Sequence, residues 1–207
     1  MSQKTKISIV ILWLFIVSGI IGITSPAKDW FLPLTPLNLS ISFILVLIHL
    51  EVINKKSLIA LSIPFFLGFI SEVLGVNFGF FFGSYDYGEN LGFKIVGVPF
   101  MIGINWVTLT VVTADFTKKI TNHRWKRVLL GAVFMTILDA LMEVSAPRFD
   151  FWQFEGDIVP IQNYIAWFCI ASLAHWGYQS LEIKTNRIIS MNILASFFLF
   201  FAIFIFV

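Results

Sequence analysis

Three acidic residues, Glu72, Asp139 and Glu143, stand inside long apolar runs of the chain. An ionisable side chain is costly within a bilayer, so such residues usually face the interior of a helix bundle and mark a functional site. Asp139 and Glu143 are four positions apart and therefore share one face of a helix. Two neighbouring carboxylates repel each other, so we expect one of the pair to hold a proton at neutral pH. A carboxylic acid beside a carboxylate is what general acid–base catalysis requires.

The composition of the 207-residue chain places these acids in a membrane protein. Hydrophobic residues make up 58% of the sequence, against about 45–50% in an ordinary protein. Charged residues make up 13% and the mean hydropathy is +0.88. A soluble chain of this length leaves too much surface exposed to hide so many apolar residues. The composition therefore excludes a soluble enzyme and a disordered chain, and the net charge of +2 gives no basis for nucleic-acid binding.

Seven apolar runs are long enough to cross a hydrocarbon core, which takes roughly 17–25 helical residues. The runs lack the alternation of barrel strands, so they predict helices. No repeat, linker or second domain is visible, and we expect a single all-α domain, residues 1–207, folded as a polytopic membrane bundle. The predicted spans are Ile7–Ile23, Phe31–Leu50, Ser57–Gly75, Ile95–Ala114, Val128–Val144, Ile158–Leu181 and Ile188–Val207.

The basic residues predict how this bundle is oriented. Seven spans place the termini on opposite sides, and eleven of the 14 Lys and Arg residues fall on the N-terminal side. Because cytoplasmic loops carry the excess of positive charge, we expect a multi-pass protein of the cytoplasmic membrane with its N-terminus inside. Two long loops, residues 76–94 and 145–159, lie on the other side. The three acids lie toward that end of their helices, so we expect them to converge beneath the loops.

The residues around Glu72 point to a close approach by another group. Gly68, Gly75 and Gly79 lie on the same helical face as Glu72 and give it no side-chain bulk. Such a face admits either another helix or a flat ligand. The three histidines are scattered, and neither a cysteine pair nor a zinc-ligand spacing is present, so we predict no metal site.

Other membrane-protein classes fit the sequence less well or remain open. A retinal protein needs a Schiff-base lysine in its last helix, and Ile188–Val207 contains none. An intramembrane prenyltransferase needs Asp-rich motifs on the cytoplasmic side, whereas the pair Asp139 and Glu143 lies toward the other side. A proton-coupled transporter stays open, although the polar groups cluster at one depth. A structural role for the acids also stays open, through a network with Asn105, Asn163 or Tyr164 or through ion pairs with Arg148.

Two stretches resemble the signatures of a family of carotenoid biosynthesis membrane proteins, the CruF-type carotenoid 1,2-hydratases and the bisanhydrobacterioruberin hydratases. The resemblance covers about residues 64–170. The first stretch reads Glu72-x-x-Gly75-x-x-x-Gly79-x-x-x-Gly83-x-Tyr85-x-Tyr87, followed by Gly97-Val98-Pro99 and Trp106. The second reads Asp139-x-x-x-Glu143, then Pro147 and Trp152, then Pro160-x-x-Asn163-Tyr164-x-x-Trp167.

The resemblance implies a lyase that adds water across the terminal C1–C2 double bond of an acyclic carotenoid without a cofactor. Asp139 lies one helical turn deeper than Glu143, so we expect Asp139 to donate the proton, Glu143 to orient the water and Glu72 to complete the site. A cyclase would begin with the same protonation, and a non-catalytic carotenoid-binding or transport protein is a further alternative. The expected partners are the carotenoid, membrane lipid and other enzymes of carotenoid biosynthesis. The expected substrate-binding residues are Tyr85, Tyr87, Trp106, Trp152, Asn163, Tyr164 and Trp167.

Overall fold

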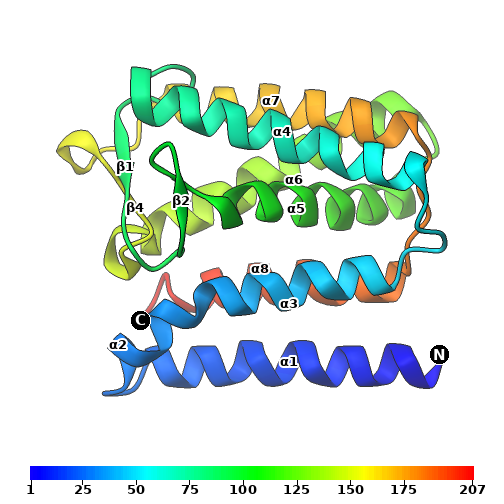
Figure 1. Ribbon diagram of the computed structural model, residues 1–207, viewed down its shortest axis with the longest axis horizontal. Coiled ribbons are helices and arrows are strands. Elements are labelled where there is room, and N and C mark those ends of the chain that lie inside the picture. The colour runs from blue at the N-terminus through cyan, green and yellow to red at the C-terminus, as the bar shows by residue number, and fades with distance from the viewer.

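The computed structural model describes all 207 residues as one bundle in which seven long helices run side by side (Figure 1). The expected all-α polytopic membrane bundle is thereby confirmed. Five segments are each long and apolar enough to cross a membrane, and α7, with 20 residues, and α8, with 17, lie alongside them. The helices are α1 (Gln3–Ile23), α2 (Lys28–Phe31), α3 (Thr35–Ile48), α4 (Lys55–Phe78), α5 (Phe100–Ile120), α6 (Arg124–Ser145), α7 (Ile161–Ser180) and α8 (Arg187–Ile203).

Helix α5 is the centre of the bundle. It packs against α3, α4, α6, α7 and α8, whereas α1 packs mainly against α2, α3 and α8 at one edge. In the most apolar stretch of α5, 78% of the residues are buried, compared with 33% in α1. Helices α4, α6 and α7 surround the same half of α5 (Figure 1), and these are the helices that carry the three intramembrane acids or face them.

Helix α4 is fixed at both ends by local sequence. At its start the Asn54 side chain accepts a hydrogen bond from the Ser57 N–H at 3.0 Å, and the Ser57 hydroxyl accepts one from the Asn54 N–H at 2.8 Å. This reciprocal cap satisfies backbone donors that a helix start otherwise leaves free. At its end Gly79 adopts a φ of +66°, which a residue without Cβ adopts readily. These caps set the position of Glu72 along the bundle.

The fourth predicted span starts later than expected. The sequence predicts a helix from Ile95, but α5 begins at Phe100 because the preceding residues form a hairpin of β2 (Lys94–Ile95) and β3 (Val98–Pro99). Gly97 has a φ of +82° in the turn, and Pro99 lacks the N–H that a longer helix would need at that point. The loop before α5 is therefore longer than its sequence pattern suggests.

A second strand pair closes the end of the bundle that lies away from the N-terminus (Figure 1). Strand β1 (Tyr85–Tyr87) pairs antiparallel with β4 (Trp152–Phe154), with Tyr85 opposite Phe154 and Tyr87 opposite Trp152. Alternate residues of a strand share a face, so these four aromatic side chains lie on one side of the pair. The C-terminus lies at this same end, which fits an odd number of passes. Which end faces the cytoplasm stays a prediction.

Candidate active site

The three intramembrane acids lie around one small buried cavity beneath the β1–β4 pair. The cavity has a volume of about 30 Å³ and is lined by residues of α4, α5, α6, α7 and both long loops. Glu72 is 3% exposed, Asp139 1% and Glu143 8%, and none of them forms an ion pair. The structure thus brings together nine of the ten residues that the sequence singles out, namely Glu72, Tyr85, Tyr87, Trp106, Asp139, Glu143, Trp152, Asn163 and Trp167.

Glu72 accepts three hydrogen bonds from aromatic side chains. The hydroxyls of Tyr85 and Tyr87 donate to Oε2 at 2.5 and 2.8 Å, and Trp106 Nε1 donates to Oε1 at 3.3 Å. Burial, and after it the nearby Glu72 carboxylate, raises the pKa of both tyrosines above their ordinary range, so both hydroxyls keep their protons at neutral pH. The Tyr-x-Tyr spacing of β1 places both donors on the same side and explains why two tyrosines reach one carboxylate.

The glycines beside Glu72 make room for these donors. A Cβ atom on Gly68 would lie 2.1 Å from Cγ of Trp106, and one on Gly75 would lie 2.8 Å from the hydroxyl oxygen of Tyr85. The sequence predicts a helix or a flat ligand against this face. In the structure the approaching groups are aromatic side chains of α5 and β1.

The other two acids, Asp139 and Glu143, are bridged by the side-chain amide of one residue, Asn163. Asn163 Nδ2 donates to Asp139 Oδ2 at 2.9 Å and to Glu143 Oε1 at 3.3 Å. Trp152 Nε1 donates to Glu143 Oε2 at 2.9 Å. The other oxygen of Asp139 has no hydrogen-bond partner in the protein. Arg148 does not reach the acids, because its guanidinium donates to the backbone carbonyls of Phe204 and Val207 instead.

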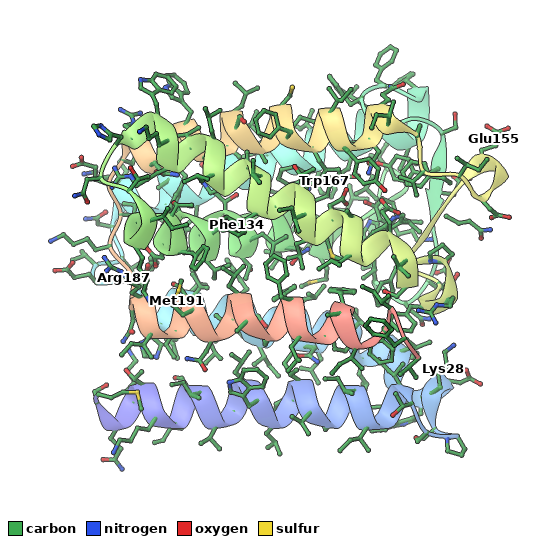
Figure 2. All side chains as sticks on the ribbon, turned by 180° about the vertical axis from the view of Figure 1, so that it is seen from behind. Lys28, Phe134, Glu155, Trp167, Arg187 and Met191 are labelled. Carbon is green, nitrogen blue, oxygen red and sulfur yellow. The ribbon has the colours of Figure 1, made fainter.

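Aromatic faces form much of the cavity wall. The indoles of Trp106 and Trp167 stack with centroids 4.2 Å apart and an interplanar angle of 12°, and Trp167 lies within the bundle in Figure 2. Tyr87 and Trp152 meet edge to face at 6.1 Å. Electron-rich faces attract a nearby positive charge, so this wall is suited to a cationic intermediate. The acids are not arranged as a group that could hold a metal ion.

The side chains of Asn105 and Tyr164 do not make the contacts that the sequence predicts for them. Asn105 lines the cavity, but its side chain bonds none of the acids, and its buried Oδ1 has no partner. A buried acceptor without a partner is costly, so a bound molecule that donates a hydrogen bond is expected there. The only sequence signal for Asn105 was that it is a polar residue next to Trp106 within an apolar run.

Tyr164 lies half-buried on α7 and does not line the cavity. The apolar lining residues that sequence reasoning missed are Phe82, Ile102, Met142 and Phe154.

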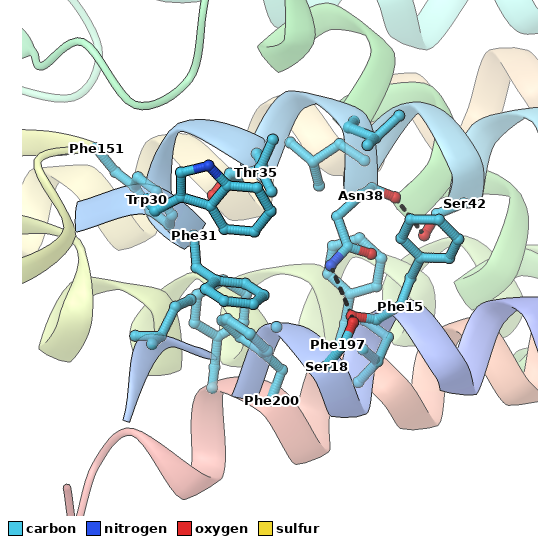
Figure 3. Close-up of a pocket in the computed structure, with 17 residues that line it drawn as sticks. Phe15, Ser18, Trp30, Phe31, Thr35, Asn38, Ser42, Phe151, Phe197 and Phe200 are labelled. Carbon is cyan, nitrogen blue, oxygen red and sulfur yellow. Dashed lines mark hydrogen bonds between the residues drawn. The ribbon is translucent and has the colours of Figure 1, made fainter. Parts of the chain in front are cut away.

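A larger cavity, of about 450 Å³, lies among α1, α2, α3 and α8 (Figure 3). Its walls are mainly aromatic and aliphatic, and no ionisable side chain lines it. The side chain of Asn38, one of the lining residues in Figure 3, donates to the Phe15 carbonyl at 3.4 Å. The cavity is suited to hydrocarbon and offers no acid or base of its own.

Comparison with known proteins agrees with this arrangement. The model of a family described as carotenoid biosynthesis protein matches residues 35–207. The chain belongs to this carotenoid biosynthesis protein family. The match includes every residue that lines the acid cavity, and it confirms the resemblance seen in the two sequence signatures. No curated protein and no solved structure matches the chain. The chain is therefore a multi-pass membrane protein with a role in carotenoid biosynthesis.

Proposed function

We propose that this protein is a carotenoid hydratase, a lyase that adds water across the terminal C1–C2 double bond of an acyclic carotenoid in the cytoplasmic membrane. The observation that supports this most strongly is the convergence of three buried acids without ion pairs on one aromatic cavity. Hydration of a trisubstituted alkene needs a proton donor, a means of stabilising a tertiary cation and one placed water. Side chains in this cavity are suited to each of these tasks.

In the first step, Asp139 donates its proton to C2 of the terminal double bond. Asp139 accepts one hydrogen bond, whereas Glu72 accepts three, so we assign the proton to Asp139 and the negative charge to Glu72. The π electrons of the double bond form the new C2–H bond and leave a tertiary cation at C1. The stacked indoles of Trp106 and Trp167 and the charge of Glu72 stabilise that cation.

In the second step, a water molecule attacks C1 and forms the tertiary alcohol. Glu143, held by Trp152 and Asn163, takes the proton that the water releases. The free Oδ1 of Asn105 accepts the other water hydrogen. One proton leaves Asp139 and one arrives at Glu143, and its return to Asp139 completes the cycle. The two acids lie within reach of one Asn163 amide, which keeps this return short.

The size of the acid cavity supports the binding of water there. A cavity of about 30 Å³ exceeds the roughly 10–15 Å³ that one water molecule needs, and polar side chains line it. The end of a carotenoid is larger, so its entry requires movement of the aromatic wall or of the β1–β4 pair. A C40 polyene is about as long as the ~30 Å hydrocarbon core, so its end reaches a site at one end of the bundle.

Cyclisation is the second candidate, because ring closure starts with the same protonation. It differs in the capture step, where a neighbouring double bond replaces water. The unpartnered Asn105 Oδ1 favours hydration, because it needs a hydrogen-bond donor that a hydrocarbon does not provide. A non-catalytic carotenoid-binding protein would gain nothing from three buried acids without ion pairs.

Expression in a lycopene-producing cell, followed by mass spectrometry of the pigments, tests the proposal. A hydratase adds 18 mass units per end group, the mass of one water. A cyclase gives a ring at unchanged mass, which chromatography separates from lycopene. An unaltered pigment would contradict both enzymatic readings on this substrate and favour binding or transport.

A further inference from the structure

A polar cavity of about 540 Å³ lies at the end of the molecule opposite the acid cavity. It forms where α5 and α7 end and where α6 and α8 begin, and it shares no residue with the acid cavity. In Figure 2, Arg187 of this cavity and Glu155 of the long loop beside the acid cavity lie at opposite ends of the bundle. Nothing in the proposed reaction uses it.

Three buried polar atoms at this cavity have no hydrogen-bond partner. They are the hydroxyl of Tyr178, Oε1 of Gln179 and Nε of Arg127. Tyr178 is 1% exposed and Gln179 is 6% exposed, so water at the surface does not reach them freely. The Gln179 amide nitrogen is within 3.1 Å of Nδ1 of His175, which leaves its oxygen as the free acceptor. Unpartnered buried groups are few in native proteins, so three at one cavity mark a place where a polar ligand can be bound.

The charges at the cavity favour an anion. Lys118 pairs with Asp115 at 2.8 Å and Lys184 with Glu51 at 3.7 Å, so these charges are compensated. The Arg127 and Arg187 side chains line the same cavity and form no ion pair. Glu182 is the remaining acidic residue in the lining, and it is exposed. The lining therefore contains two guanidinium groups without an ion pair and one exposed carboxylate without an ion pair.

We propose that this cavity binds a phosphate group, either in the headgroup of an anionic phospholipid or in a dissolved phosphate compound. Guanidinium groups donate paired hydrogen bonds that match phosphate oxygens, and the Tyr178 hydroxyl supplies another donor. The free oxygen of Gln179 accepts a hydrogen bond from a hydroxyl beside the phosphate. Basic cavities between helices at the cytoplasmic side bind such headgroups, and the charge pattern predicts that this end of the bundle faces the cytoplasm.

Binding measurements on the purified full-length protein in neutral detergent test the proposal. The probes are phosphatidylglycerol, phosphatidylcholine and inorganic phosphate, and the readouts are retained lipid in native mass spectrometry and the thermal unfolding midpoint. We expect Arg127→Gln to weaken phosphatidylglycerol binding about 10- to 100-fold, as the loss of a charged hydrogen bond predicts, and Tyr178→Phe about 2- to 10-fold. Lys126→Gln, an exposed cation outside the cavity, should change it less than about twofold.

The pattern of results identifies the source of the phosphate or overturns the site. Selective retention of phosphatidylglycerol over phosphatidylcholine, with little effect of inorganic phosphate, identifies a lipid headgroup. Equal protection by millimolar phosphate alone, lost in Arg127→Gln, identifies a dissolved phosphate compound. Wild-type binding in both cavity variants would place the anion outside this cavity, and no binding of either anion would likewise overturn the proposal. Tyr178→Phe changes one hydroxyl, so it keeps the test valid even where Arg127→Gln fails to fold.

Discussion

At the residue scale, the three acids of the cavity differ in the number of donors that hold them. Glu72 accepts three hydrogen bonds, Glu143 two and Asp139 one. Donors stabilise a carboxylate and leave an acid with few donors as the natural carrier of a proton. This inequality gives three chemically similar residues three different proposed roles.

Replacement of Asp139 by asparagine tests the most specific of these roles. Asp139→Asn keeps an oxygen that can accept from Asn163 but lacks the acidic carboxyl proton, so conversion should fall about 10²- to 10⁴-fold while insertion and pigment binding persist. Product formation and co-purified pigment are the measurements. Asp86→Asn, which changes an exposed acid on β1, is the control and should convert at the wild-type rate. Conversion near wild type in Asp139→Asn would mean that another group donates the proton.

The tyrosine donors to Glu72 permit a second test at this scale. Tyr85→Phe and Tyr87→Phe each remove one hydrogen bond to a buried carboxylate, a loss of about 1.5–3 kcal/mol. We expect each variant to lose about tenfold or more in conversion rate. Tyr164→Phe is the matched control, because Tyr164 does not line the cavity. A comparable loss in Tyr164→Phe would instead place its hydroxyl in the site.

At the scale of elements, contact between α4 and α5 sets the position of Trp106. A Cβ on Gly68 would lie 2.1 Å from the Trp106 ring, so Gly68→Ala must displace the ring from Glu72. We expect a loss of about 1–3 kcal/mol in stability, a lower unfolding midpoint and reduced conversion. In Gly19→Ala on α1 the nearest atom lies 3.4 Å away, so that control should be neutral or slightly stabilising. Equal midpoints for the two variants would argue against this packing.

The elements also show what could be predicted from the sequence and what could not. Continuous apolar runs predict the long helices, because length and composition alone decide whether a helix can span a membrane. The hairpin before α5 escaped prediction, since Ile95 and Val98 continue the apolar pattern while the turn depends on the backbone conformation at Gly97. The pairing of β1 with β4 joins segments far apart in the chain, and no local pattern encodes it.

The same distinction applies to the site. Glu72, Asp139 and Glu143 were visible because charge inside an apolar run is costly and therefore rare. The contact of Trp106 with Gly68 could not be predicted in full, because the glycines of α4 indicate that some group approaches closely but do not identify it. Asn105 was visible only as a polar residue in an apolar run, because its significance lies in an oxygen that the fold leaves without a partner.

At the scale of the whole molecule, the two ends of the bundle have different chemistry. One end carries the β1–β4 pair and the acid cavity, and the other carries the polar cavity and the N-terminus. Eleven of the 14 basic residues belong to the N-terminal side in the predicted topology. The positive-inside rule therefore predicts that the acid cavity lies toward the outer face of the membrane.

Cysteine labelling in intact cells tests this orientation directly. The chain has one cysteine, Cys169, so Cys169→Ser gives a background into which single cysteines can be placed. Glu155→Cys lies in the loop beside the acid cavity and Asn122→Cys in the connection between α5 and α6, and both positions are exposed. A membrane-impermeant maleimide should label Glu155→Cys in intact cells and Asn122→Cys only after permeabilisation. The reverse pattern would place the acid cavity on the cytoplasmic side, and water and substrate would then reach it from there.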